Sequence, residues 1–238
     1  MTTTTVKTAY LKGLAAGVPF ILVIVPFSML FGLLATEAGL SVIQALTFSL
    51  VVIAGAAQFT ALQLLQEEAP TVIVLISALA VNLRMAMYSA SLTPWIGSAP
   101  LWQRACAAYL TVDQSYIVAM AQFEKEPQMT VPERMAYFFG AVSPVAPLWY
   151  IFTAVGAMVG TQVPESWALD FAIPITFLAM IAPMFRTLPH VIAAFVAVVA
   201  SLLCASVPYS LGIIIAGMIG MIAGAQAELW LDRKGTHL

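Results

Sequence analysis

Long apolar runs separated by short polar breaks dominate this sequence of 238 residues. Hydrophobic residues make up 62% of the chain and charged residues 8%, with a mean hydropathy of +0.98. A helix that crosses a bilayer needs about 20 apolar residues, so the chain has room for roughly seven or eight of them. The runs cover residues 13–36, 41–66, 71–91, 105–123, 135–160, 168–186, 190–206 and 208–229. The pattern predicts an all-α polytopic membrane protein with about eight transmembrane helices.

The breaks between the runs are short, so we expect residues 1–238 to form a single integral membrane domain. The first run is too long for the core of a signal peptide, and we expect it to be retained as a membrane helix. Residues 1–12 are predicted to be a polar cytoplasmic segment and residues 230–238 a cytoplasmic tail.

The distribution of lysine and arginine predicts the orientation of the chain in the membrane. If the N-terminus is cytoplasmic and each run crosses once, Arg104 lies outside and Arg84 lies within a span. The other basic residues then lie inside, namely Lys7, Lys12, Lys125, Arg134, Arg186, Arg233 and Lys234. This bias follows the positive-inside rule. It favours eight crossings with both termini in the cytoplasm.

Several runs contain proline, which removes a backbone donor and kinks or breaks a helix. The proline pairs are Pro19 with Pro26, Pro144 with Pro147, and Pro174 with Pro183. Transporters use broken membrane helices to bind substrate. Proline is also more frequent in membrane helices in general, so both interpretations of these positions stay open.

Arg84 and Asp113 lie well inside apolar runs, whereas almost every other charge falls in a break or close to the end of a run. A charge at membrane depth costs at least about 2.5–3.5 kcal/mol on insertion scales, so such residues are functional candidates. With the 71–91 and 105–123 runs as consecutive antiparallel helices, Arg84 lies about 20 Å and Asp113 about 18 Å above the cytoplasmic side. We therefore expect the two charges to neutralise each other. Re-entry of the 92–104 connection into the membrane would shift this register.

Three roles remain open for this pair. The guanidinium of Arg84 suits a substrate carboxylate, because its planar fork binds one with two hydrogen bonds. Asp113 is a candidate for carrying a coupling proton, and a pair that breaks when substrate takes Arg84 would link the two roles. The alternative is a structural ion pair that only fixes helix packing.

Several function classes find no support in the sequence. There is no GxxxxGK[ST] loop for nucleotide phosphates and no basic run for nucleic acid. The 2 histidines are too few for a histidine-based metal site, and we expect no cofactor. An intramembrane enzyme would need a nucleophile and base at membrane depth. Because we find no such set, we expect the protein not to be an enzyme.

Four segments of the chain carry a family resemblance: KGLAAGVPF at 12–20, GAAQF at 55–59, NLRMAMYS at 82–89 and LAMIAP at 178–183. They resemble the AzlC family, the large subunits of branched-chain amino-acid exporters. The resemblance implies a secondary transporter domain in a bacterial cytoplasmic (inner) membrane. It would export leucine, isoleucine, valine or methionine together with a small AzlD-type membrane subunit. We expect this export to be coupled to protons. The alternatives are a permease for another small carboxylate and an ABC-linked permease subunit.

The family motifs carry over onto five residues of this chain as substrate-binding candidates. They are Gln58, Asn82, Arg84, Tyr88 and Ser89. Asp113 lies outside these motifs and is a proton-coupling candidate from the depth argument alone. A zwitterionic amino acid with an apolar side chain needs a cation, hydrogen-bond acceptors and an apolar wall, and this set supplies those types.

Overall fold

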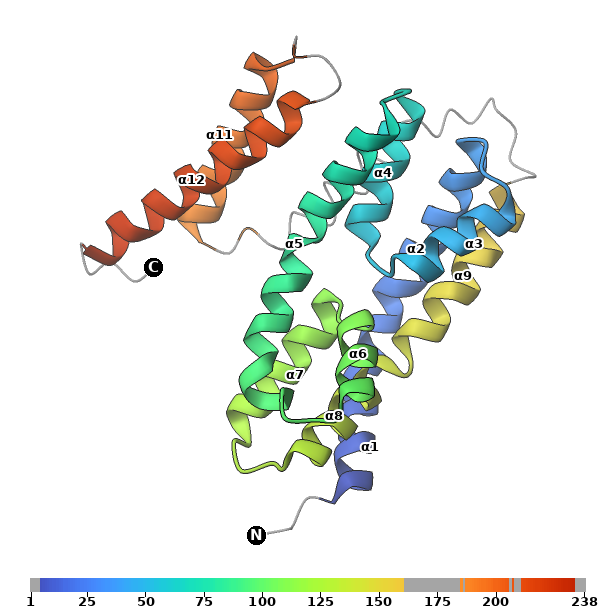
Figure 1. The fold of residues 1–238 in the computed structure, drawn as a ribbon, viewed down its shortest axis with the longest axis vertical. Coiled ribbons are helices and arrows are strands. Elements are labelled where there is room, and N and C mark those ends of the chain that lie inside the picture. Colours follow the sequence, from blue (N-terminus) through green and yellow to red (C-terminus); the bar gives the residue numbers. More distant parts are fainter. Residues whose placement is uncertain (1–4, 161–184, 186, 206, 208–210, 234–238) are drawn as a thin grey trace. The chain divides into compact units, whose positions relative to one another are not determined.

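The computed structural model describes residues 5–160, 185, 187–205, 207 and 211–233. Every regular element in these ranges is helical (Figure 1). The elements are α1 (Val6–Gly17), the 3₁₀ turn η1 (Val18–Phe20), α2 (Ile21–Glu37), α3 (Val42–Val51), α4 (Gly55–Gln66), α5 (Thr71–Ile96), α6 (Leu101–Tyr109), α7 (Asp113–Lys125), α8 (Val131–Val142), α9 (Val145–Gly160), α11 (Leu188–Leu203) and α12 (Leu211–Arg233).

Contacts divide the chain into two compact units. Met1–Phe59 and Leu79–Pro164 form the first unit, and Thr60–Ala78 and Glu165–Leu238 form the second. Among the described residues, three helical segments are long and apolar enough to cross a membrane: Val6–Glu37, Thr71–Ile96 and Val131–Gly160. The prediction of an all-helical membrane protein is therefore confirmed in its general form.

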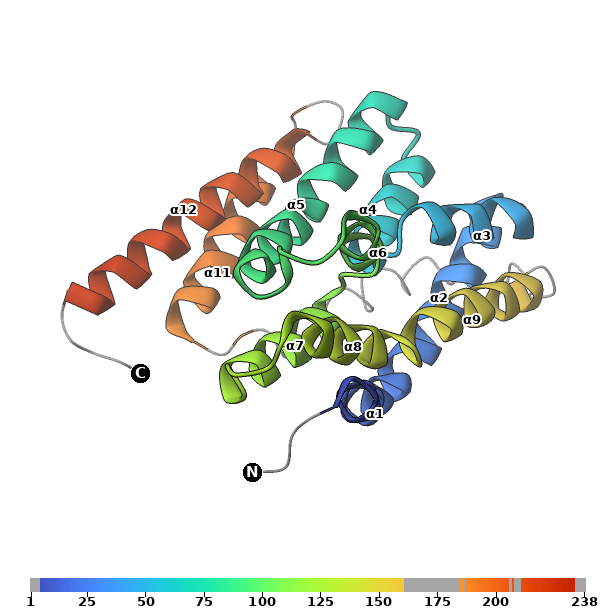
Figure 2. The same ribbon diagram turned by 60° about the horizontal axis from the view of Figure 1, so that its bottom comes forward.

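The α1–α2 and α8–α9 segments form the central packing of the first unit, and they run in the same direction (Figure 2). Gly13 lies against Tyr137 in one half of this contact, and Gly32 lies against Thr153 in the other. A Cβ atom at either glycine would clash with the backbone of the facing helix. Small residues of this kind let membrane helices approach closely, and packing rather than water exclusion then stabilises the pair.

Pro19 and Pro144 lie where the helices change geometry, whereas Pro26 and Pro147 lie inside helices. Pro19 lies in η1, which joins α1 to α2, and Pro26 lies inside α2. Pro144 lies in the turn between α8 and α9. Pro174 and Pro183 lie outside the described residues.

The second and fourth runs are each divided into two helices, which corrects the expectation that each run forms one. In the second run α3 ends at Val51 and α4 begins at Gly55. In the fourth run α6 ends at Tyr109 and α7 begins at Asp113. Neither break contains proline, and the backbone becomes extended at Val52, with φ −130° and ψ 95°.

The expected antiparallel arrangement of the third and fourth runs is wrong, because α5 and α7 run in the same direction. Their contacts advance together along both helices, from Arg84 with Asp113, through Ser91 with Tyr116, to Trp95 near Phe123. The short helix α6 returns alongside α5 before the chain reverses into α7 (Figure 1). Helix α6 therefore makes the connection that lets α5 and α7 run in the same direction.

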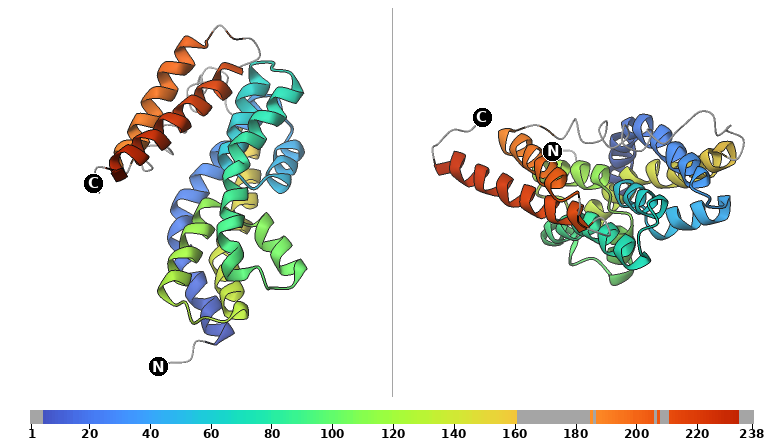
Figure 3. Two further views of the ribbon diagram at one scale, coloured as in Figure 1. Left: turned by 60° about the vertical axis from the view of Figure 1, so that its left-hand side comes forward. Right: turned by 90° about the horizontal axis from the view of Figure 1, so that it is seen from above.

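In the second unit, α11 and α12 form an antiparallel hairpin (Figure 3). Gly220 lies against Ala193 and Ala197 at the crossing, while Gly212 lies near Cys204 at the turn. Helix α12 continues to Arg233, so the first part of the predicted 230–238 tail is helical. Of the sixth run, only Phe185 is described.

Candidate functional site

Arg84 and Asp113 form an ion pair inside the first unit. The Nη1 atom of Arg84 lies 2.9 Å from Oδ2 of Asp113, and the two side chains are 24% and 31% exposed. The predicted contact is therefore confirmed, although the helices that carry it run parallel rather than antiparallel. Partial exposure leaves room for the pair to exchange partners, which a fully buried pair would not allow at low cost.

The start of α7 places Asp113 at a position that favours a negative charge. Asp113 is the first residue of α7, and unpaired amide groups at a helix N-terminus stabilise an anion there. The Oγ atom of Ser115 accepts a hydrogen bond of 2.8 Å from the backbone N–H of Val112 and so fixes the turn. The break at 110–112 thus brings both a helix end and a carboxylate to Arg84.

Tyr88 completes the shell around the Asp113 carboxylate. Its hydroxyl donates to Oδ1 of Asp113 at 3.0 Å, so each carboxylate oxygen has a separate partner. The ring of Tyr88 stacks on that of Tyr116, with centroids 4.1 Å apart and 9° between the planes. The Tyr116 hydroxyl lies 3.1 Å from Oγ of Ser91, a residue that the sequence analysis did not single out.

Gln58 lies in a second polar cluster, at the break between α3 and α4. Its side-chain Nε2 donates to Oγ of Ser49 at 2.9 Å, and Ser49 lies 3.1 Å from Oγ1 of Thr153. Thr153 in turn donates to the carbonyl of Trp149 at 2.8 Å. Gln58, Ser49 and Thr153 are fully buried. Isolated hydroxyls inside apolar runs were the only sequence signal for Ser49 and Thr153.

The two helix breaks are linked by Tyr109 at the end of α6. Its hydroxyl donates to the carbonyl of Leu50 at 2.5 Å and lies 2.8 Å from the hydroxyl of Tyr150. Leu50 lies in the last turn of α3, where carbonyl groups have no partner within the helix. Tyr109 lies four residues before Asp113 in the sequence, but its hydroxyl contacts the α3–α4 break.

Five buried side-chain atoms in the described part of the chain have no hydrogen-bond partner. They are Oε1 of Gln58, Oδ1 of Asn82, Nε of Arg84, Nε of Arg134 and Nε1 of Trp149. An unpaired buried polar group costs about 1–3 kcal/mol, so such atoms are uncommon unless a ligand or water satisfies them. Three of them belong to predicted substrate-binding residues.

Ser89 lies apart from the Arg84–Asp113 pair, on a cavity of about 200 Å³ between α5 and α6. Its carbonyl accepts a hydrogen bond of 2.8 Å from the hydroxyl of Thr93. The five predicted substrate residues therefore fall into distinct environments: Arg84 with Tyr88, Gln58 with Ser49, and Ser89 in the cavity. Asn82 lies on α5 with its Oδ1 unpaired.

Basic residues hold the helix ends at the side of the first unit where α1 begins. Lys12 pairs with Glu126 at 3.1 Å, and this charged hydrogen bond lowers the pKa of Glu126. Arg134 donates to the carbonyls of Trp95 and Pro127 at 3.1 and 2.6 Å, and its guanidinium lies 4.9 Å from the Trp95 ring centroid. These contacts tie the ends of α5 and α7 to α8 and α1.

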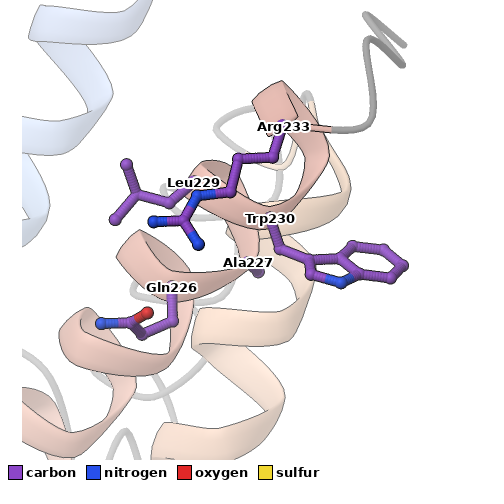
Figure 4. Close-up of a pocket in the computed structure, with 5 residues that line it drawn as sticks. All are labelled: Gln226, Ala227, Leu229, Trp230 and Arg233. Carbon is purple, nitrogen blue, oxygen red and sulfur yellow. The ribbon is translucent and has the colours of Figure 1, made fainter.

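A larger concavity of about 390 Å³ lies on the last turns of α12 in the second unit. Figure 4 shows that its lining residues, among them Gln226, Trp230 and Arg233, all come from this one helix. It is a surface hollow along a single helix, and none of the unpaired buried atoms described above lies in it.

Comparisons with known proteins agree with the membrane architecture. The chain is 24% identical over 235 residues to "Inner membrane protein YgaZ" of Escherichia coli, covering 93% of this chain and 91% of that protein. It is 26% identical to an uncharacterized membrane protein of Helicobacter pylori, covering 74% of this chain and 75% of the relative. An uncharacterized membrane protein of Archaeoglobus fulgidus is 27% identical, covering 72% of this chain and 74% of the relative. No solved structure matches the chain.

A profile of the family described as "AzlC protein" matches residues 19–163. This range includes both helix breaks, the Arg84–Asp113 pair and the Gln58 cluster. The resemblance inferred from the sequence motifs is therefore confirmed, and the chain belongs to the AzlC family.

Proposed function

We propose that this protein is a secondary transporter that exports leucine, isoleucine and valine, with methionine as a further substrate, across the bacterial inner membrane. It works with a small AzlD-type membrane subunit and is driven by the proton gradient. Family membership supports a role in membrane transport. The choice of substrate and partner rests on the sequence resemblance and on the chemistry of the polar residues.

The observation that carries the proposal is the set of unpaired buried atoms on the candidate residues. Oε1 of Gln58 and Oδ1 of Asn82 are acceptors without a donor, which is what a substrate ammonium group supplies. Nε of Arg84 is a donor without an acceptor, which is what a carboxylate supplies. A zwitterionic amino acid carries both kinds of group that these residues lack, and it would meet them at separate positions, because Gln58 and Arg84 lie in different environments.

The coupling step that we propose is an exchange of partners at Arg84. The substrate carboxylate binds the Arg84 guanidinium and displaces Asp113. The displaced Asp113 carboxylate stays deprotonated and holds the substrate ammonium group on the way out. After the substrate leaves on the outside, Asp113 takes up a proton there, releases it on the cytoplasmic side and pairs with Arg84 again, so proton and substrate move in opposite directions. Tyr88 donates to Asp113 in the resting state and orients the carboxylate for this exchange.

We also propose a membrane topology for residues 6–160, with three full crossings and two re-entrant hairpins. The crossings are Val6–Glu37, Thr71–Ile96 and Val131–Gly160. At about 1.5 Å per residue, α3, α4, α6 and α7 are each about 14–20 Å long, which is too short for a hydrocarbon core of about 30 Å. The α3–α4 and α6–α7 pairs then enter the membrane from opposite sides and return.

Charge placement supports this topology over eight simple crossings. With a cytoplasmic N-terminus, Lys7, Lys12, Lys125 and Arg134 stay inside, and Arg104 moves from the outside to the inside. Arg104 was the one basic residue in this part of the chain that lay outside, and with this topology it follows the positive-inside rule as well. The cytoplasmic placement of the C-terminus remains a prediction from the sequence.

Counterflow in proteoliposomes tests the proposed function. The chain is reconstituted with its small subunit, vesicles are loaded with unlabelled valine, and uptake of labelled valine or methionine is followed. We expect exchange that disappears when Arg84 is replaced with Gln. No exchange of any branched-chain amino acid in the complete complex would contradict the proposal, and exchange of a different small carboxylate would favour the alternative permease.

A further inference from the structure

The cavity between α5 and α6 has one apolar wall and one polar rim. Leu92 and Ile96 of α5 face Ala107 and Ala108 of α6 across about 200 Å³. The small alanine side chains on α6 leave the space that the larger α5 side chains do not fill. An aliphatic side chain is therefore the kind of group that the wall accommodates.

The hydroxyl groups of the cavity present acceptors. Thr93 donates to the carbonyl of Ser89 at 2.8 Å, and Thr111 donates to the carbonyl of Ala107 at 2.7 Å. Each hydroxyl proton is thus used by the backbone, while the oxygen lone pairs remain available. Two such oxygens on the cavity lining suit an ammonium group.

Arg104 supplies a positive charge to the same cavity. It lines the cavity from the first half of α6, and its side chain is exposed. Within the described ranges the ion pairs are Lys12–Glu126 and Arg84–Asp113, so Arg104 has no carboxylate partner there. A cation beside an apolar cavity selects an anionic group on a partly apolar ligand.

We propose that this α5–α6 cavity is a second amino-acid site, which takes a zwitterionic amino acid with an aliphatic side chain. Arg104 binds the carboxylate, Thr93 and Thr111 accept from the ammonium group, and Leu92 and Ile96 contact the side chain. The inference rests on the proposed function. The place of the cavity in transport follows from its position in the first unit. Ile96 lines the cavity and is next to Trp95, whose carbonyl accepts from Arg134 at the end of the unit where α1 begins. The cavity captures substrate at this end and the Arg84 site then receives it.

The test is substrate binding and transport by the full chain with its small subunit, with Arg104→Gln and Ala108→Leu as variants. Ala108→Leu adds bulk at the cavity lining without changing charge, and Ala105→Leu, at an alanine that is also exposed but does not line the cavity, is the matched control. We expect both cavity variants to lose one bound valine per chain and to raise the KM at least about tenfold, with kcat nearly unchanged. The control keeps the wild-type stoichiometry and KM.

Unchanged stoichiometry and KM in both cavity variants, with an active wild type, would overturn the second site and leave the proposed function standing. Loss of co-purified phosphatidylglycerol from Arg104→Gln at unchanged KM would identify the cavity as a lipid phosphate site and would also overturn it. If the wild type neither binds nor exchanges branched-chain amino acids, the proposed function fails, and the second site fails with it.

Discussion

Arg84 and Asp113 are joined by a 2.9 Å ion pair across two helices that run in the same direction. Replacing either residue leaves the other as an unpaired charge, which costs about 1–3 kcal/mol of unfolding free energy at this partial exposure. We expect Arg84→Gln and Asp113→Asn each to lower the thermal stability in detergent, and the double variant to recover most of it. Transport by the double variant should stay absent, because no cation remains for the substrate. Wild-type transport by the double variant would show that the pair only holds two helices together.

Asp113→Asn by itself separates coupling from binding. Asparagine keeps the shape of the side chain and still accepts from the Tyr88 hydroxyl, but it carries no proton to the other side. We expect valine counterflow to persist and proton-driven accumulation to be lost. The measurement is uptake with and without an imposed pH gradient, with Glu126→Gln as the control for loss of a carboxylate elsewhere. A pH dependence equal to that of the wild type would remove Asp113 from the coupling role.

The Arg84–Asp113 contact was predictable because an unpaired charge at membrane depth is costly, and pairing with an opposite charge lowers that cost. The direction of α7 was not predictable, because the 105–123 run has the length of one crossing and its break at 110–112 contains neither glycine nor proline. The break at 52–54 is equally unmarked. Both breaks are stabilised by contacts between distant residues, such as Tyr109 with the Leu50 carbonyl, and local sequence does not encode those contacts. The Ser49–Gln58–Thr153 cluster was not predictable either, because its hydrogen bonds join Ser49 to Thr153, which is distant in the sequence, and to Gln58 across the α3–α4 break.

Gln58→Leu, compared with Ser49→Ala, should separate binding from stability in the α3–α4 cluster. Leucine has a similar size but removes both the unpaired acceptor and the Nε2 donor to buried Ser49, so the unfolding free energy should fall by about 1–3 kcal/mol. Substrate affinity should fall at least about tenfold if Oε1 holds the ammonium group. Ser49→Ala is the control, since it removes a hydrogen bond and keeps this oxygen. Normal affinity in Gln58→Leu, together with this loss of stability, would give Gln58 a structural role.

The Lys12–Glu126 pair predicts a small acid sensitivity. The charged hydrogen bond from Lys12 lowers the pKa of Glu126 below its ordinary value of 4.5 in the folded state. The stabilisation is therefore complete above about pH 4.5 and is lost as the pH falls through the lowered pKa. Because the Lys12 side chain is 42% exposed, the effect is below about 1 kcal/mol. Thermal unfolding between about pH 3 and 6 should show this loss in the wild type and not in Lys12→Met, and equal acid sensitivity in both would contradict it.

The position of Gln103 distinguishes the re-entrant topology from eight simple crossings. The re-entrant α6–α7 hairpin places Gln103 on the cytoplasmic side, whereas eight crossings place it outside. Single cysteines are introduced at Gln103, Glu37 and Glu124 after Cys106 and Cys204 are replaced with serine, since both are free thiols. A membrane-impermeant maleimide should then label Gln103→Cys and Glu124→Cys from the cytoplasmic side, and Glu37→Cys from the outside. Both topologies agree on Glu37 and Glu124, so these two positions calibrate the assay. Labelling of Gln103→Cys from the outside would restore the eight-crossing arrangement and require α6 to lie near the outer surface.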